Sequence, residues 1–100
     1  MELYMSIIVV PYGHARRIIR VAIGAGVKGA TILHARGVEK SKKEGFFHFS
    51  IEPEQEIVLI VATKEVTDAI GEKISHVDAA RSGGAALYIL PVKGLDSYTN

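Results

Sequence analysis

The chain has 100 residues, of which 48% are hydrophobic, so it is large enough to bury the core of one compact domain. Its 12 basic and 11 acidic residues give a net charge of +1. This balance disfavours nucleic acid as a partner, because phosphate backbones attract proteins with a clear basic excess. The lack of cysteine excludes disulfides, thiolate zinc sites and a cysteine nucleophile, and it is compatible with a reducing compartment.

The N-terminal segment has neither the charge pattern of a signal peptide nor the length of a membrane span. Glu2 lies where a basic region is expected, and no small-residue cleavage site follows. The apolar runs of the chain are too short to cross a bilayer. We therefore expect a cytoplasmic protein that does not insert into a membrane.

The first 26 residues predict a strand followed by a helix. Residues 5–10 are mostly apolar and β-branched, and Pro11, Tyr12 and Gly13 then supply a turn, as expected after a strand. Between residues 15 and 23 the apolar side chains recur at helical spacing, with arginines on the opposite side. The glycines at 24 and 26 end this helix.

The next segment predicts a second strand that runs into a loop. Residues 27–36 carry short apolar side chains and Thr31, which suit a strand. The stretch up to Gly45 is charged and contains glycine, so it is not expected to bury itself. We therefore place a large loop at about residues 37–50, with a cluster of phenylalanines at its far end.

The second half predicts a strand, a helix and a last strand. After a turn-like "EPEQ" at 52–55, the uniformly apolar run "EIVLIVAT" at 56–63 indicates a strand buried on both faces and central in the sheet. Residues 64–77 have one apolar helical face, with Thr63 available as the N-cap. A glycine-containing loop then precedes the strand "ALYILPV" at 86–92.

The order strand, helix, strand, strand, helix, strand predicts a single α+β domain over residues 1–100 with the ferredoxin-like fold, a four-stranded antiparallel sheet with two helices on one face. Two helices cover only one face of the sheet, yet the first, third and fourth strands are apolar at consecutive positions. The second face therefore also requires cover. Another copy of the chain is the economical cover, so we expect a homo-oligomer.

Four segments, in this order along the chain, carry a resemblance to a known family. They are "VVPYG" at 9–13, "KGATILHARG" at 28–37, "IEPEQEIVLIVAT" at 51–63 and "SGGAALYILPV" at 82–92. Together they resemble the superfamily of P-II signalling proteins, the nitrogen regulatory proteins. The similarity spans nearly the whole chain, and the large loop is shorter than in classical members.

This resemblance implies a non-enzymatic regulatory protein. It implies a homotrimer of ferredoxin-like subunits whose sheets face inward, with an adenine nucleotide (ADP, AMP or ATP) as the regulatory ligand in the clefts between subunits. It also implies that the large loop contacts and controls a target protein, and that no cofactor is obligatory.

The resemblance assigns the adenine pocket to Ile8, Thr31 and the backbone near Ile60. Gly37, at the base of the large loop, would bring its backbone close to the nucleotide, and Lys40 would respond to it there.

The phosphate side of the implied site is formed by Arg81, Gly83 and Gly84. Successive amides in a glycine-rich turn form an anion-binding concavity, and an arginine adds charge-assisted hydrogen bonds. The chain departs from the family pattern at Ala86, where a lysine is typical, and Lys93 is the one basic residue near the C-terminus.

Two other functions remain open from the sequence. The missing lysine at Ala86 suits an interaction trimer that has lost nucleotide binding. A trimer that binds a metal or a small metabolite through His34 or His48 is the other, since the divalent-cation tolerance proteins are also trimeric and ferredoxin-like. The histidines lack ligand spacing, so we predict no metal site, and without a nucleophile elbow or paired carboxylates we predict no catalytic residue.

Overall fold

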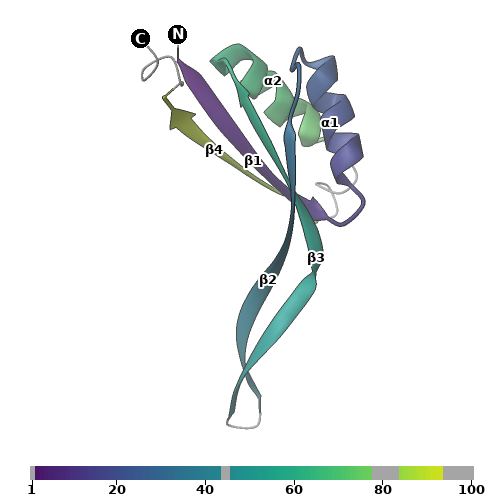
Figure 1. Ribbon diagram of the computed structural model, residues 1–100, viewed down its shortest axis with the longest axis vertical. Coiled ribbons are helices and arrows are strands. Elements are labelled where there is room, and N and C mark those ends of the chain that lie inside the picture. Colours follow the sequence, from purple (N-terminus) through teal and green to yellow (C-terminus); the bar gives the residue numbers. More distant parts are fainter. Residues whose placement is uncertain (1, 44–45, 78–83, 94–100) are drawn as a thin grey trace.

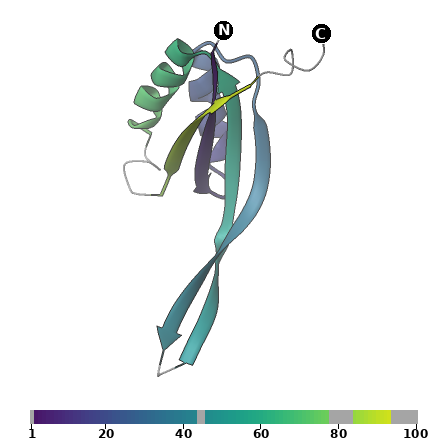
Figure 2. The ribbon, with the colours of Figure 1, turned by 90° about the vertical axis from the view of Figure 1, so that its left-hand side faces the viewer.

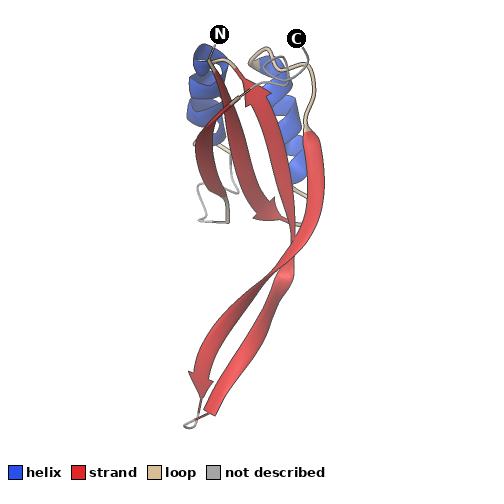
Figure 3. Ribbon diagram, turned by 60° about the vertical axis from the view of Figure 1, so that its left-hand side comes forward, coloured by secondary structure: helices blue, strands red, loops and turns tan. Residues whose placement is uncertain are grey.

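The computed structural model describes residues 2–43, 46–77 and 84–93. The elements in chain order are β1 (Leu3–Pro11), α1 (Ala15–Gly24), β2 (Thr31–Lys43), β3 (Phe46–Ala62), α2 (Lys64–Ile74) and β4 (Ala86–Val92) (Figure 1). The strands form one antiparallel sheet in the order β2-β3-β1-β4. Both helices lie on the same face of this sheet (Figure 3). The predicted ferredoxin-like fold is therefore confirmed.

Most element boundaries agree with the sequence. β4 has the predicted bounds, and β3 lies between β2 and β1, which confirms its central position. α2 ends at Ile74, three residues before the predicted end at residue 77, and Thr63 is its N-cap without a side-chain hydrogen bond. Neither helix in the described part of the chain is long and apolar enough to cross a membrane.

The loop expected at residues 37–50 is a β-hairpin over the part that the structure describes. β2 continues to Lys43 and β3 begins at Phe46, with these two residues paired across the strands. The turn expected at 52–55 is likewise part of β3. In a two-stranded ribbon the inward backbone groups pair with the partner strand and water satisfies the outward ones, and both faces are exposed, so a charged sequence does not exclude it. Figures 1 and 2 show the far part of this hairpin standing clear of the helices.

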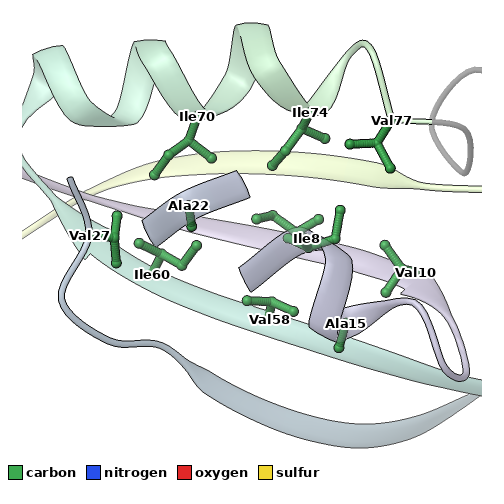
Figure 4. Packing of buried hydrophobic residues seen from close by; sticks show 11 residues of the cluster. Ile8, Val10, Ala15, Ala22, Val27, Val58, Ile60, Ile70, Ile74 and Val77 are labelled. Carbon is green, nitrogen blue, oxygen red and sulfur yellow. The ribbon is translucent and has the colours of Figure 1, made fainter. Parts of the chain in front are cut away.

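The core lies between the helices and one face of the sheet (Figure 4). Along β1, Ile8 and Val10 are buried while the residues between them are only partly covered, as expected for a strand with one packed face. Their neighbours on β3 and both helices complete the core. The buried hydrophobic residues are Ile8, Val10, Ala15, Ile18, Ala22, Val27, Val58, Ile60, Ile70, Ile74 and Val77.

The opposite face of the sheet is also apolar, and no element in the described part of the chain covers it. We call it the open sheet face. The side chains of residues that pair directly across antiparallel strands point to the same face of the sheet. The open sheet face therefore includes Ile7, its partner Leu59, every second residue along their strands, and the residues paired with these. Val61 and Tyr88 are 53% and 59% exposed. Its apolar members are Leu3, Met5, Ile7, Val9, Leu33, Ile57, Leu59, Val61, Ala86, Tyr88, Leu90 and Val92. An apolar surface of this kind marks an interaction site.

Truncation of the core residue Ile8 is expected to lower the free energy of unfolding far more than truncation on the hairpin. Ile8→Ala should lose about 2–5 kcal/mol, and Ile8→Val about 0.5–1.5 kcal/mol, because each leaves a cavity in the core. Ile51 is 67% exposed, so Ile51→Ala should change stability by about 0.5 kcal/mol or less. Urea unfolding at one protein concentration measures all three variants, and equal losses for Ile8→Ala and Ile51→Ala would contradict the packing described above.

Candidate functional site

A pocket lies where the hairpin leaves the body of the domain. Its lining residues come from the end of β1, from β3 and from the residues just before β4. Its volume is about 260 Å³. We call it the hairpin-base pocket, lined by Pro11, Pro53, Glu54, Gln55 and Gly84. Gly84 is thus the one sequence-predicted site residue among its described walls.

Gly37 lies on the same stretch of the sheet. The pairing of β2 with β3 shifts register between Arg36 and Val38, where Gly37 alone opposes residues 52 and 53, as in a β-bulge whose extra residue lies in β3. A bulge bends its strand and increases the local twist. The predicted base of the large loop is therefore a bend in a continuous strand, located where the hairpin begins.

Thr31 lies on the edge strand β2, level with Ile7 in the middle of β1. It is the first residue of β2, it is exposed, and it pairs with Leu59. Close to it in sequence is a second pocket of about 520 Å³, at the N-terminal end of α2. We call it the α2 pocket, lined by Leu3, Gly26, Val27, Lys28, Gly29, Val61, Ala62, Thr63 and Val66.

The two pockets are too far apart in one chain to hold the same small molecule. Leu3 of the α2 pocket and Pro11 of the hairpin-base pocket are the two ends of β1. A strand rises about 3.3 Å per residue, which separates these ends by roughly 25 Å. Thr31 begins the edge strand β2 and Gly84 precedes the other edge strand, β4, so the structure does not bring these two residues together within one chain either.

The other predicted site residues are buried or undescribed. The side chains of Ile8 and Ile60 are buried in the core, so only their backbone could contact a ligand. The backbone of Lys40 continues β2, but its side chain lies outside the described residues. Arg81 and Gly83 lie outside them entirely.

Glu56 of β3 supplies the acceptor for the N-terminal end of α1. Its Oε1 atom accepts hydrogen bonds from the backbone N–H of Gly13, at 2.7 Å, and of Ala15, at 3.1 Å. The N-cap residue, His14, makes no side-chain capping bond, and the first turn of α1 has no acidic residue. Glu56 therefore satisfies amides that the helix leaves unpaired and places a negative charge at the positive end of its dipole.

His34 connects this carboxylate to the hairpin. Its Nδ1 atom lies 3.3 Å from Oε1 of Glu54, and its Nε2 atom lies 4.0 Å from Oε2 of Glu56. The ring of Tyr12 meets the His34 ring edge-on with centroids 5.6 Å apart, and the Tyr12 N–H donates to the Glu54 carbonyl at 3.2 Å. We call these four residues the hairpin-base cluster. It ties the turn before α1 to β2 and β3.

Sequence reasoning missed this cluster because it treated "EPEQE" as a solvated turn. The available signal was the alternation of acidic residues at 52, 54 and 56, which is also the period of a strand. The alternative function, a metal bound through His34 or His48, is not supported by the described residues. No three His, Asp or Glu side chains there are arranged to hold a metal ion.

Comparison with known proteins gives matches in structure but not in sequence. No family model matches the chain, and no curated protein is significantly similar to it. GlnK of B. subtilis in complex with ATP has a TM-score of 0.74 at 17% identity, over 91% of this chain and 82% of GlnK. A PII-like signaling protein from Thermus thermophilus has a TM-score of 0.70 at 21% identity, over 92% and 87%. The divalent ion tolerance protein of Ehrlichia chaffeensis has a TM-score of 0.65 at 14% identity, over 92% and 82%.

These similarities confirm the predicted resemblance to P-II-like proteins at the level of the fold. The same fold occurs in the divalent ion tolerance protein. The fold alone therefore does not choose between a nucleotide and a metal as the ligand, and the choice depends on the residues of the site.

Replacement of Glu56 is expected to destabilise the protein through the start of α1. Glu56→Ala should lower the free energy of unfolding by about 1–2 kcal/mol, because two backbone amides lose their acceptor. Glu56→Gln keeps a side-chain oxygen and should lose less. Glu72→Ala, at an exposed position of α2, serves as the control with little effect. Urea unfolding measures the losses, and a Glu56→Ala variant as stable as Glu72→Ala would show that the capping contact contributes nothing.

Proposed function

We propose that this chain is a non-enzymatic regulatory protein. In this proposal it assembles as a homotrimer, binds an adenine nucleotide in the clefts between subunits, and controls a target protein through the β2–β3 hairpin. The observation that carries the proposal is the separation of Thr31 and Gly84 between the two edges of the sheet, at β2 and just before β4. Such a site is complete only when two copies of the chain meet.

The open sheet face supports the assembly. An apolar surface that includes Ile7, Leu59 and Tyr88 would be in water in a single chain. A second copy of the same face is a matching cover, and closed homo-oligomers are the usual form of such assemblies. In a ring of three, the hairpin-base pocket of one subunit can meet the α2 pocket of the next.

The positions of the predicted residues support a nucleotide in that cleft. Thr31 and the backbone near Ile60 would contact the adenine, and the backbone of Ile8 lies on the neighbouring strand. Gly37 and Gly84, at the hairpin base, would allow the polar end of the ligand to approach the backbone. GlnK of B. subtilis, which has this fold, is known as a complex with ATP. Lys40, Arg81 and Gly83 remain sequence-based members of the proposed site.

The hairpin is the proposed contact with the target. Val38 and Ile51 pair across its strands and are 64% and 67% exposed, so they offer an apolar surface to a partner. A ligand shifts the hairpin only if it binds one arrangement better than another. The bulge at Gly37 is where a difference in arrangement would arise, because it lies between the sheet and the hairpin.

Calorimetric titration of the purified protein with ATP, ADP, AMP and adenosine tests nucleotide binding. We expect heat of binding with at least one of these compounds. Gly84→Val should weaken that binding about tenfold or more, because the added side chain fills the pocket wall, whereas Glu72→Ala should leave it unchanged. The oligomer should survive in both variants. Absence of heat with every adenine compound would rule out the nucleotide-binding proposal.

Light scattering tests the trimer. We expect three chains per particle for the unmodified protein. Leu59→Asp places a carboxylate on the open sheet face and should reduce the particle to one folded chain, with helical circular dichroism retained. Asp68→Asn on the exposed side of α2 should remain trimeric. A monomeric unmodified protein would overturn the intersubunit site.

A further inference from the structure

The hairpin-base pocket, where the polar end of the ligand is expected, has an acidic residue among those that line it. Glu54 lines the pocket together with Pro11, Pro53, Gln55 and Gly84, and none of these described lining residues is basic. We propose that Glu54 selects the ligand by charge, so that the site binds an adenine nucleoside or its monophosphate in preference to the triphosphate. This inference rests on the proposed nucleotide site and names its ligand class.

Glu54 is held in position rather than free to turn away. It lies within β3, and its carbonyl accepts the N–H of Tyr12 at 3.2 Å. Its carboxylate oxygen Oε1 meets Nδ1 of His34 at 3.3 Å. The side chain is nevertheless 39% exposed, so the carboxylate of this pocket-lining residue remains accessible from solvent.

A fixed carboxylate acts on each negative charge that is brought near it. The monophosphate carries fewer charges than the triphosphate, and the nucleoside carries none. The repulsion therefore grows with the number of phosphates, although partial exposure of Glu54 to water screens it. An uncharged hydroxyl of a nucleoside can instead donate a hydrogen bond to the carboxylate.

Among the residues that the structure describes, the other charged groups around Glu54 do not supply a clear positive excess. Glu56 adds a second carboxylate, with its Oε1 atom engaged by the amides at the start of α1. His34 lies between the two carboxylates. Arg36 is the cross-strand partner of Glu54 and has an exposed side chain. Among the described cations, Arg36 is the one that the strand pairing places next to Glu54, where it could attract a phosphate. The carboxylate of Glu54 itself offsets that charge.

The experiment compares adenosine, AMP and ATP by calorimetry in buffer that contains EDTA, at one ionic strength. For the unmodified protein we expect AMP to bind about tenfold more tightly than ATP. Glu54→Gln removes the charge and keeps the shape, so it should tighten ATP binding about tenfold and leave adenosine binding unchanged. The adenosine affinity also shows that the pocket is intact. Glu72→Gln, which removes a carboxylate from the exposed side of α2, should change none of the affinities.

The outcomes separate this inference from the proposed function. If the unmodified protein binds ATP as tightly as AMP and Glu54→Gln leaves the ATP affinity unchanged, Glu54 does not select by charge, while the nucleotide site stands. If Arg36→Gln weakens ATP binding and Glu54→Gln does not strengthen it, Arg36 decides the preference and the inference is wrong. If none of the three compounds binds, the nucleotide site and the inference fail together.

Discussion

A four-stranded sheet has two faces, and two helices cover only one of them. The rest of the molecule depends on this constraint. On the covered face, Ile8 and Ile60 pack beneath α1 and α2 and form the core. The side chains of Leu59 and Tyr88 point to the opposite, open face, and no element in the described part of the chain covers them. The need to bury this second face favours an assembly, and the assembly is what would unite the two distant pockets into one site.

The hairpin-base cluster connects the start of α1 to the strands of the hairpin. Glu56 bonds the start of α1, and His34 links Glu56 and Glu54 to the first part of β2. The hairpin beyond it is paired strand rather than an irregular loop. In our proposal, a ligand at the base of the hairpin changes the direction in which the paired strands leave the sheet at Gly37. It does not need to order a disordered segment. The paired Val38 and Ile51 would move with these strands.

Fold similarity does not decide the chemistry of this protein. GlnK in complex with ATP and a divalent ion tolerance protein share the architecture, so the ligand has to be argued from side chains. In the described part of the chain no group of His, Asp or Glu residues is arranged for a metal ion. The hairpin-base pocket is bordered by Glu54. In our proposal, this acidic residue makes ligand charge the property that distinguishes the site from one built for a triphosphate.

The sequence by itself determined the order of the strands and helices, the central place of β3 and the presence of a second apolar face. These features depend on local periodicity, which neighbouring residues encode. Tertiary structure alone decided that residues 38–43 and 46–51 pair as a hairpin, because solvated strands and loops share the same polar composition. It also decided that Glu56 caps α1 across 43 residues of sequence and that Thr31 and Gly84 lie at opposite edges of the sheet. Such contacts join segments that are distant in sequence, so no local sequence pattern indicates them. The residues assigned to nucleotide contact remain a prediction for the same reason.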